Sequence, residues 1–153
     1  MTLLLAFLIG FFGGLRSLIP PAAVAWAVHL GLLRIERPLA LVGSVPGVAI
    51  FTLLALVELV ADKLPQTPSR TALPGLTARI LLGGLTGACV AAGVGMGAFV
   101  GAGLGAAGGV AGAFGGHRAR TGLVSALKMP DIYVALLEDL VAIGGSVWVV
   151  SRF

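Results

Sequence analysis

The chain has 153 residues, of which 58% are hydrophobic and only 10% are charged, and its mean hydropathy is +1.09. A soluble globular surface typically needs roughly a quarter to a third of its positions charged, so the composition argues against a water-soluble enzyme domain, a disordered tail and a disulfide scaffold. It predicts one integral membrane domain over residues 1–153. A net charge of +4 would suit a nucleic-acid partner, but we expect none, because the ten Lys and Arg residues lie singly between apolar runs.

Six apolar segments in chain order predict an all-α membrane protein with about six short hydrophobic segments. The first two, residues 2–14 and 18–33, are shorter than the roughly 20 residues that cross a bilayer core. We expect them either to thin the bilayer or to form a broken or re-entrant pair. The third, residues 39–61, is a full-length span, and Pro46-Gly47 predicts a kink near its start.

The next stretch, residues 62–75, is polar and contains three prolines, which predict a loop. Residues 80–116 then carry no charge, and a single helix of 37 residues would be nearly twice as long as a bilayer core is thick. We therefore expect two spans with a turn near residues 91–95. The polar sequence 116–121 ends this pair, a connector runs to Pro130, and residues 131–150 form the last span.

Glycines recur every four residues within the uncharged stretch. On a helix this spacing makes a ridge without side chains, along which another backbone can pack closely. The ridge predicts a contact surface between helices or between protomers, and its members are Gly93, Gly97, Gly101, Gly105 and Gly109. A weaker repeat, residues 12–16 against 114–118, indicates either duplicated halves or a chance recurrence of a Gly-Gly-x-Arg helix end.

Six segments would place both termini on one side of the membrane. The loops after the first, third and fifth segments hold seven Lys and Arg residues, whereas the opposite side holds three, Arg34, Arg37 and Arg152. The positive-inside rule then predicts a multi-pass protein of the bacterial inner membrane with both termini outside.

The densest polar sites all fall on the predicted cytoplasmic side. A carboxylate within a span costs about 2.5 to 3.5 kcal/mol on insertion scales, so it should be paired, protonated or next to water. Arginine and hydroxyl groups beside prolines suit phosphate or carboxylate, especially at a helix N-terminus. The candidate substrate or ion site comprises Arg16, Ser17, Glu58, Asp62, Lys63, Thr67, Ser69, Arg70, Arg79, Arg118, Arg120, Asp131, Glu138 and Asp139.

The same residues also fit purely structural roles, as Glu–Arg pairs between helices, capping turns and snorkelling arginines. His117 is predicted to be an ordinary loop residue. We expect no metal and no cofactor, because no His or Cys pair has metal-ligand spacing and no phosphate or dinucleotide motif is present.

Several sequences carry a family resemblance: Gly14-Leu15-Arg16-Ser17 with Pro20-Pro21-Ala22, residues 58–65 running into Thr67-Pro68-Ser69-Arg70-Thr71, Arg79, and Glu138-Asp139. With them the chain, over essentially its whole length, resembles a family of bacterial integral membrane proteins catalogued as domain of unknown function 4126. The resemblance implies a small multi-span membrane protein and brings no settled activity.

We therefore expect a small transporter or channel for an anion or a proton-coupled solute, acting as a homo-oligomer in the lipid bilayer. One alternative is a non-catalytic scaffold or partner subunit, in which the ion pairs are structural. The other is a membrane enzyme acting on a phosphate-bearing lipid through Asp62, Arg70, Arg118 and Glu138. The enzyme is the least expected of the three, because the sequence presents no identifiable nucleophile–base pair or metal cluster.

Overall fold

The computed structural model describes residues 2–63, 72–128 and 130–153. The described residues contain no strand, which confirms the all-helical prediction. The helices are α1 (Thr2–Leu15), α2 (Ile19–His29), the short 3-10 helix η1 (Leu39–Gly43), α3 (Val45–Ala61), α4 (Leu73–Ala92), α5 (Ala98–Leu127) and α6 (Asp131–Val150).

Three helices are long and apolar enough to cross a membrane, namely α4, residues 98–126 of α5, and α6. Together with the composition, they indicate a membrane protein. α1 and α3 are shorter apolar helices. At 1.5 Å per residue, the 14 residues of α1 measure about 21 Å, less than the roughly 30 Å of a bilayer core. The broken or re-entrant arrangement of the first pair stays a prediction.

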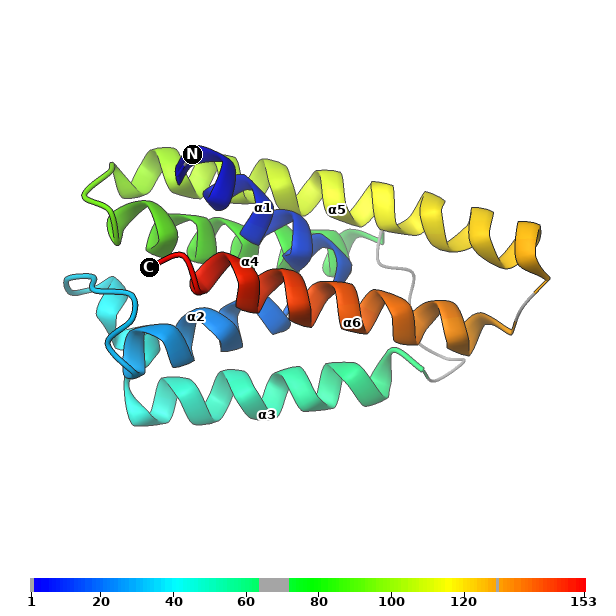
Figure 1. The fold of residues 1–153 in the computed structure, drawn as a ribbon, viewed down its shortest axis with the longest axis horizontal. Coiled ribbons are helices and arrows are strands. Elements are labelled where there is room, and N and C mark those ends of the chain that lie inside the picture. The colour runs from blue at the N-terminus through cyan, green and yellow to red at the C-terminus, as the bar shows by residue number, and fades with distance from the viewer. Residues whose placement is uncertain (1, 64–71, 129) are drawn as a thin grey trace.

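The helices form an elongated bundle in which successive helices alternate in direction (Figure 1). Both ends of the chain lie at the same end of the bundle. At the other end, α5 and α6 extend beyond the turn between α1 and α2, which therefore lies part of the way along the bundle.

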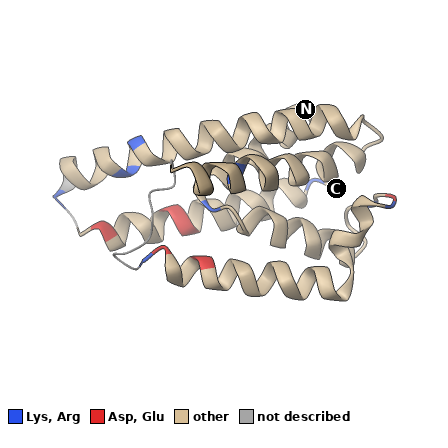
Figure 2. Ribbon diagram, turned by 180° about the vertical axis from the view of Figure 1, so that it is seen from behind, with Lys and Arg blue, Asp and Glu red and all other residues tan. Residues whose placement is uncertain are grey.

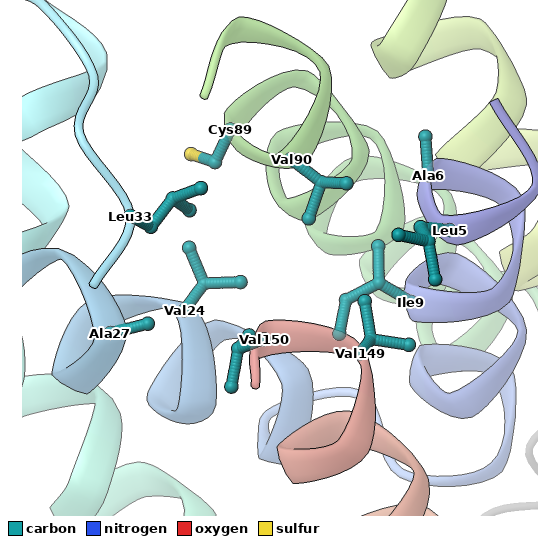
Figure 3. Packing of buried hydrophobic residues seen from close by; sticks show 10 residues of the cluster. All are labelled: Leu5, Ala6, Ile9, Val24, Ala27, Leu33, Cys89, Val90, Val149 and Val150. Carbon is teal, nitrogen blue, oxygen red and sulfur yellow. The ribbon is translucent and has the colours of Figure 1, made fainter. Parts of the chain in front are cut away.

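Part of the core consists of small and branched side chains from four helices and one connection. Leu5 and Ile9 of α1 meet Val149 of α6 and Val90 of α4, and Leu33 reaches in from the segment after α2 (Figure 3). Cys89 is a free, buried thiol in the same cluster, where it acts as a small apolar filler.

The tightest packing joins α5 to α4 and α1 through glycine. A Cβ added at Gly105 would lie 2.1 Å from the carbonyl oxygen of Gly83 in α4, and one at Gly108 would lie 2.1 Å from that of Phe7 in α1. Real Cβ atoms do not approach so closely, so α5 presents glycine to a neighbouring backbone on each of two faces. Only hydrogen at these positions allows the three helices to come this close.

The predicted five-glycine ridge is interrupted by the turn between α4 and α5. Gly101, Gly105 and Gly109 lie within α5, whereas Gly93 is the C-cap of α4 and Gly97 the N-cap of α5. The turn falls at residues 93–97, slightly later than the predicted 91–95, and Gly95 adopts a φ of 70° there. A role of this surface in joining protomers stays a prediction.

The starts of two helices differ from the prediction, and both lie at a proline. Pro46 does not kink a long span; it lies in the first turn of α3, whose N-cap Ser44 accepts a hydrogen bond from the backbone N–H of Gly47. Pro74 likewise lies in the first turn of α4, which begins at residue 73 rather than 80. A proline lacks only an N–H that has no partner in a first turn, so it favours a helix start.

α5 continues to Leu127, so the prediction that it ends near Gly116 and that His117 lies in a loop is wrong. Arg118 and Arg120 are compatible with helix interiors, and an exposed face gives their charges access to solvent or a partner. The connector to α6 shrinks to three residues, and Lys128 ends α5 in the left-handed conformation with a φ of 51°.

The glycine packing predicts opposite effects for two neighbouring substitutions in α5. Gly105→Ala places a methyl group against the backbone of α4 and should destabilise the bundle by about 1 to 3 kcal/mol. Gly103→Ala has no atom within 4 Å of its Cβ and should leave stability unchanged or raise it by up to about 1 kcal/mol, because alanine favours a helix. Unfolding midpoints in detergent micelles measure both, and equal midpoints would contradict the packing.

Candidate functional site

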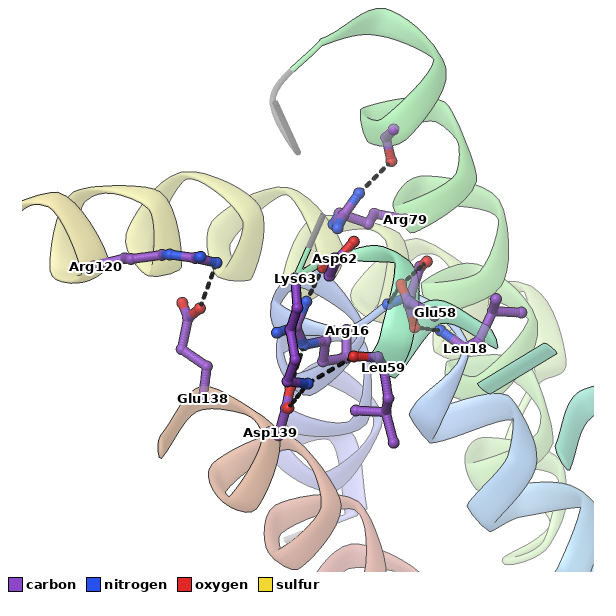
Figure 4. A network of polar contacts seen from close by, with 12 residues as sticks. Arg16, Leu18, Glu58, Leu59, Asp62, Lys63, Arg79, Arg120, Glu138 and Asp139 are labelled. Atoms are coloured by element: carbon purple, nitrogen blue, oxygen red, sulfur yellow. Dashed lines mark hydrogen bonds and ion pairs between the residues drawn. The ribbon is translucent and has the colours of Figure 1, made fainter. Parts of the chain in front are cut away.

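The turn between α1 and α2 carries a polar segment, Arg16-Ser17-Leu18, into the interior of the bundle. The backbone N–H of Arg16 still bonds to the carbonyl of Phe12 in α1, at 3.0 Å, and α2 begins at Ile19 with Pro20 and Pro21 in its first turn. Because both helices are short, the turn reaches the end of α3 and the middle of α6 (Figure 4). Arg16 is 0% exposed there.

Two carboxylates from different helices hold the Arg16 guanidinium. Its Nε donates a hydrogen bond to Oδ1 of Asp139 in α6, at 2.5 Å, and its Nη1 forms an ion pair with Oδ2 of Asp62 at the end of α3. Neither Nη atom has a hydrogen-bond partner of regular geometry among the described residues, and Nη2 has no ion-pair partner there either. A buried donor left unsatisfied typically costs about 1 to 3 kcal/mol.

Asp139 links Arg16 to a second cation. Its Oδ2 accepts a hydrogen bond from Nζ of Lys63, at 2.7 Å, and the same Nζ donates to the carbonyl oxygen of Leu59, at 2.6 Å. The carboxylate thus bridges the two cations with its two oxygens, one to each. Asp139 is 6% exposed, so this bridge lies largely away from solvent.

Glu58 in α3 satisfies the beginning of α2. Its Oε1 accepts hydrogen bonds from the backbone N–H of Ser17, at 2.8 Å, and from the Ser17 hydroxyl, while its Oε2 accepts from the N–H of Leu18, at 2.8 Å. A helix N-terminus has free N–H groups and a partial positive charge that favour an anion. Here, the anion beside Arg16-Ser17 is a carboxylate of the chain itself. We call Arg16, Ser17, Glu58, Asp62, Lys63 and Asp139 the Arg16 network.

Arg79 of α4 binds backbone rather than the predicted carboxylates in its described hydrogen bonds. Its Nε donates to the carbonyl oxygen of Gly14, at 3.0 Å, and its Nη1 to that of Gly75, at 2.9 Å. The first of these carbonyls belongs to the last turn of α1, where carbonyl groups lack helical partners. Arg79 therefore fixes the end of α1, immediately before Arg16.

A second polar group connects α5 to the start of α6. Arg120 donates from Nε to Oδ1 of Asp131, at 2.7 Å, and from Nη2 to Oδ2 of the same carboxylate, a bidentate pair. Its Nη1 reaches Oε2 of Glu138 at 3.4 Å. Asp131 is more exposed than any carboxylate of the Arg16 network, with 59% of its side chain accessible.

The structure divides the predicted site residues into sets. The Arg16 network is one, Arg120 with Asp131 and Glu138 is another, Arg79 binds backbone, and Arg118 is exposed on α5. Thr67, Ser69 and Arg70 lie outside the described residues. Sequence reasoning missed the backbone partners, the N–H of Leu18 and the carbonyls of Gly14 and Leu59, because main-chain groups have no sequence signature.

Charged residues gather toward one end of the bundle (Figure 2). That end holds both polar groups, whereas the connection after α2 carries a separate charged cluster, Arg34, Glu36 and Arg37, at the other end. Within the described ranges, no group of three or more His, Cys, Asp or Glu residues could hold a metal ion. The Arg16 network presents side-chain charges and the Nη hydrogen-bond donors of Arg16.

A shallow pocket of about 320 Å³ lies on the surface between α2 and α3. Its lining is mainly apolar, and Trp26 donates from Nε1 to the hydroxyl of Thr52 across it, at 3.1 Å. It contains none of the residues of the Arg16 network. The pocket is lined by Trp26, His29, Val45, Val48, Ala49 and Thr52.

Comparison with known proteins identifies one relationship. Residues 3–151 match the model of a family described as a domain of unknown function (DUF4126). Neither the curated proteins nor the solved structures contain a significant match.

The burial of Arg16 predicts a large effect of its removal on stability. Arg16→Met leaves Asp62 and Asp139 without their shared cation and should lower the free energy of unfolding by about 3 to 5 kcal/mol. Arg152→Met is the matched control: its guanidinium lies exposed, 4.7 Å over the Trp148 ring, and its loss should cost about 1 kcal/mol or less. Denaturation in detergent micelles measures both, and equal losses would show that the Arg16 ion pairs contribute little.

Proposed function

Because the chain belongs to the DUF4126 family of unknown function, its activity must be inferred from its own residues, and we propose that it is a small membrane transporter that moves an anion together with a proton. The observation that carries this proposal is the position of Asp139 between Arg16 and Lys63. A carboxylate that bridges a buried and a partly exposed cation can exchange places with an anion from outside, provided that it takes up a proton.

Charge balance is the physical reason for coupling the two. Protonated Asp139 no longer neutralises Arg16 and Lys63, and an unneutralised buried charge is costly. A singly charged anion bound to the two cations restores the original net charge. The other charged groups near this point are Asp62 on Arg16, Glu58 at the start of α2, and Arg120 across from Glu138.

The unsatisfied Nη2 of Arg16 also supports the proposal. It is a buried donor that the chain leaves without an acceptor among the described residues, on the same guanidinium whose Nε binds Asp139. We further propose that the protein works as a homo-oligomer in the bacterial inner membrane, with the Arg16 network toward the cytoplasmic side. A chain of this length has little room for a complete pathway, and further protomers would supply its walls.

A structural scaffold is the second candidate. It is favoured by the observation that Glu58, Asp62 and Asp139 all have partners within the chain. In that case the ion pairs only join α1, α3 and α6. The two candidates differ in one respect, since a scaffold never exchanges the Asp139 carboxylate for another anion.

Solute uptake into proteoliposomes tests the proposal with a panel of chloride, nitrate, formate, acetate and phosphate, after subtraction of the uptake of protein-free liposomes, because undissociated formic and acetic acid cross lipid unaided. With an acidic exterior, the transported anion should accumulate about tenfold for each pH unit of gradient, because cotransport of one proton with one monovalent anion is electroneutral and each factor of ten corresponds to about 1.4 kcal/mol. Asp139→Asn cannot take up the proton and should abolish this accumulation.

Glu36→Gln is the matched control, because it makes the same chemical change at an exposed position outside the Arg16 network. It should accumulate the anion as the unaltered protein does. Absence of flux for the whole panel would overturn the transporter in favour of the scaffold, and accumulation that persists in Asp139→Asn would overturn the role of Asp139.

A further inference from the structure

We infer that the ligand of the Arg16 network is a small, planar oxyanion with a single negative charge, of which formate and acetate are the simplest. This inference rests on the proposed function, because it takes the anion to replace Asp139 on Arg16 and Lys63. It adds the chemical class of the substrate, which follows from the geometry of the donors.

Asp139 accepts hydrogen bonds from two donors, one with each oxygen of its carboxylate. Oδ1 accepts from Nε of Arg16 at 2.5 Å, and Oδ2 accepts from Nζ of Lys63 at 2.7 Å. A replacement ligand therefore has to present two oxygen acceptors held apart by a central atom. Carboxylates do this, whereas a halide is a single atom that would have to reach both nitrogens at once.

The guanidinium of Arg16 favours the same geometry. Its five N–H groups form a planar, rigid fork that matches two coplanar oxygens. Nε is used by Asp139 and Nη1 faces Asp62, while the buried Nη2 has no hydrogen-bond or ion-pair partner in the described part of the chain. An oxyanion at this position could bind Nε and the free Nη2 donor together, which Asp139 alone does not.

The residues that already bind this segment point to the same class. Glu58, Asp62 and Asp139 are all carboxylates, and between them they contact Nε and Nη1 of Arg16 and accept from the N–H groups of Ser17 and Leu18. The segment is thus arranged for carboxylate oxygens in its resting state.

Charge and burial restrict the ligand further. One proton on Asp139 removes one negative charge, so a monovalent anion restores the balance, whereas a dianion such as sulfate would add an uncompensated buried charge. Arg16 is 0% exposed and Asp139 6% exposed, so a ligand that takes the place of the Asp139 carboxylate should have few atoms.

Binding to the purified full-length chain in detergent tests the inference independently of transport. Equilibrium dialysis with radiolabelled formate is run at pH 5 and pH 7.5, with acetate, nitrate, chloride and sulfate as competitors at equal ionic strength. Formate should bind more tightly at pH 5, acetate and nitrate should displace it, and chloride and sulfate should require at least tenfold higher concentrations.

Two variants locate the site. Arg16→Lys keeps the charge but loses the planar fork, and it should weaken formate binding at least tenfold. Lys63→Gln, at a partly exposed position, removes the second cation and should have a similar effect, which keeps the test valid if Arg16→Lys fails to fold. Arg37→Lys, exposed outside the network, is the control and should bind formate normally.

The outcomes separate this inference from the proposed function. Formate binding that depends on Arg16 or Lys63, without any flux in proteoliposomes, would support the oxyanion site and overturn the transporter. Proton-coupled flux of chloride without formate binding would overturn the oxyanion site and leave the transporter. Equal binding of chloride and formate, or formate binding that is unchanged in both Arg16→Lys and Lys63→Gln, would overturn the inference.

Discussion

The structure depends on a buried guanidinium. Arg16 immediately follows α1, has no exposed surface, and is neutralised by Asp62 from the end of α3 and Asp139 from the middle of α6. In an apolar protein a charge in this position has to be met by charges from other helices, because water is excluded. The need to neutralise Arg16 therefore ties together three segments that are far apart in the sequence.

Two kinds of packing meet at this residue. On one side, α1, α4 and α5 approach each other backbone to backbone, as Gly10 and Gly83 against Gly105 illustrate. On the other side, α2, α3 and α6 pack through larger side chains and are joined to the end of α1 by the Arg16 network. Glycine contacts offer no ionisable group, whereas the network contains three carboxylates and two cations.

Much of the fold could be predicted from the sequence, and the failures have physical causes. Apolar runs and prolines revealed the helices, but α5 passes through His117 and Arg120 to Leu127, because helix formation tolerates charges that find solvent or a partner. Pro46 and Pro74 start helices instead of kinking or preceding them, since a first turn does not use the proline's missing N–H. Sequence pattern alone does not distinguish these outcomes.

The sequence by itself determined the class of protein and the residues that bear charge, because hydropathy and the cost of intramembrane charge depend on composition and local order. Only the tertiary structure decided how those charges are paired: Glu58 with the start of α2, Asp139 with Arg16 and Lys63, and Arg79 with the end of α1. Pairing depends on the positions of helix ends in space and on backbone groups that every residue has. For that reason, the sequence predicted one collection of polar residues. The fold separates them into the buried Arg16 network and the more exposed contacts of Arg120 in α5 with Asp131 and Glu138 in α6.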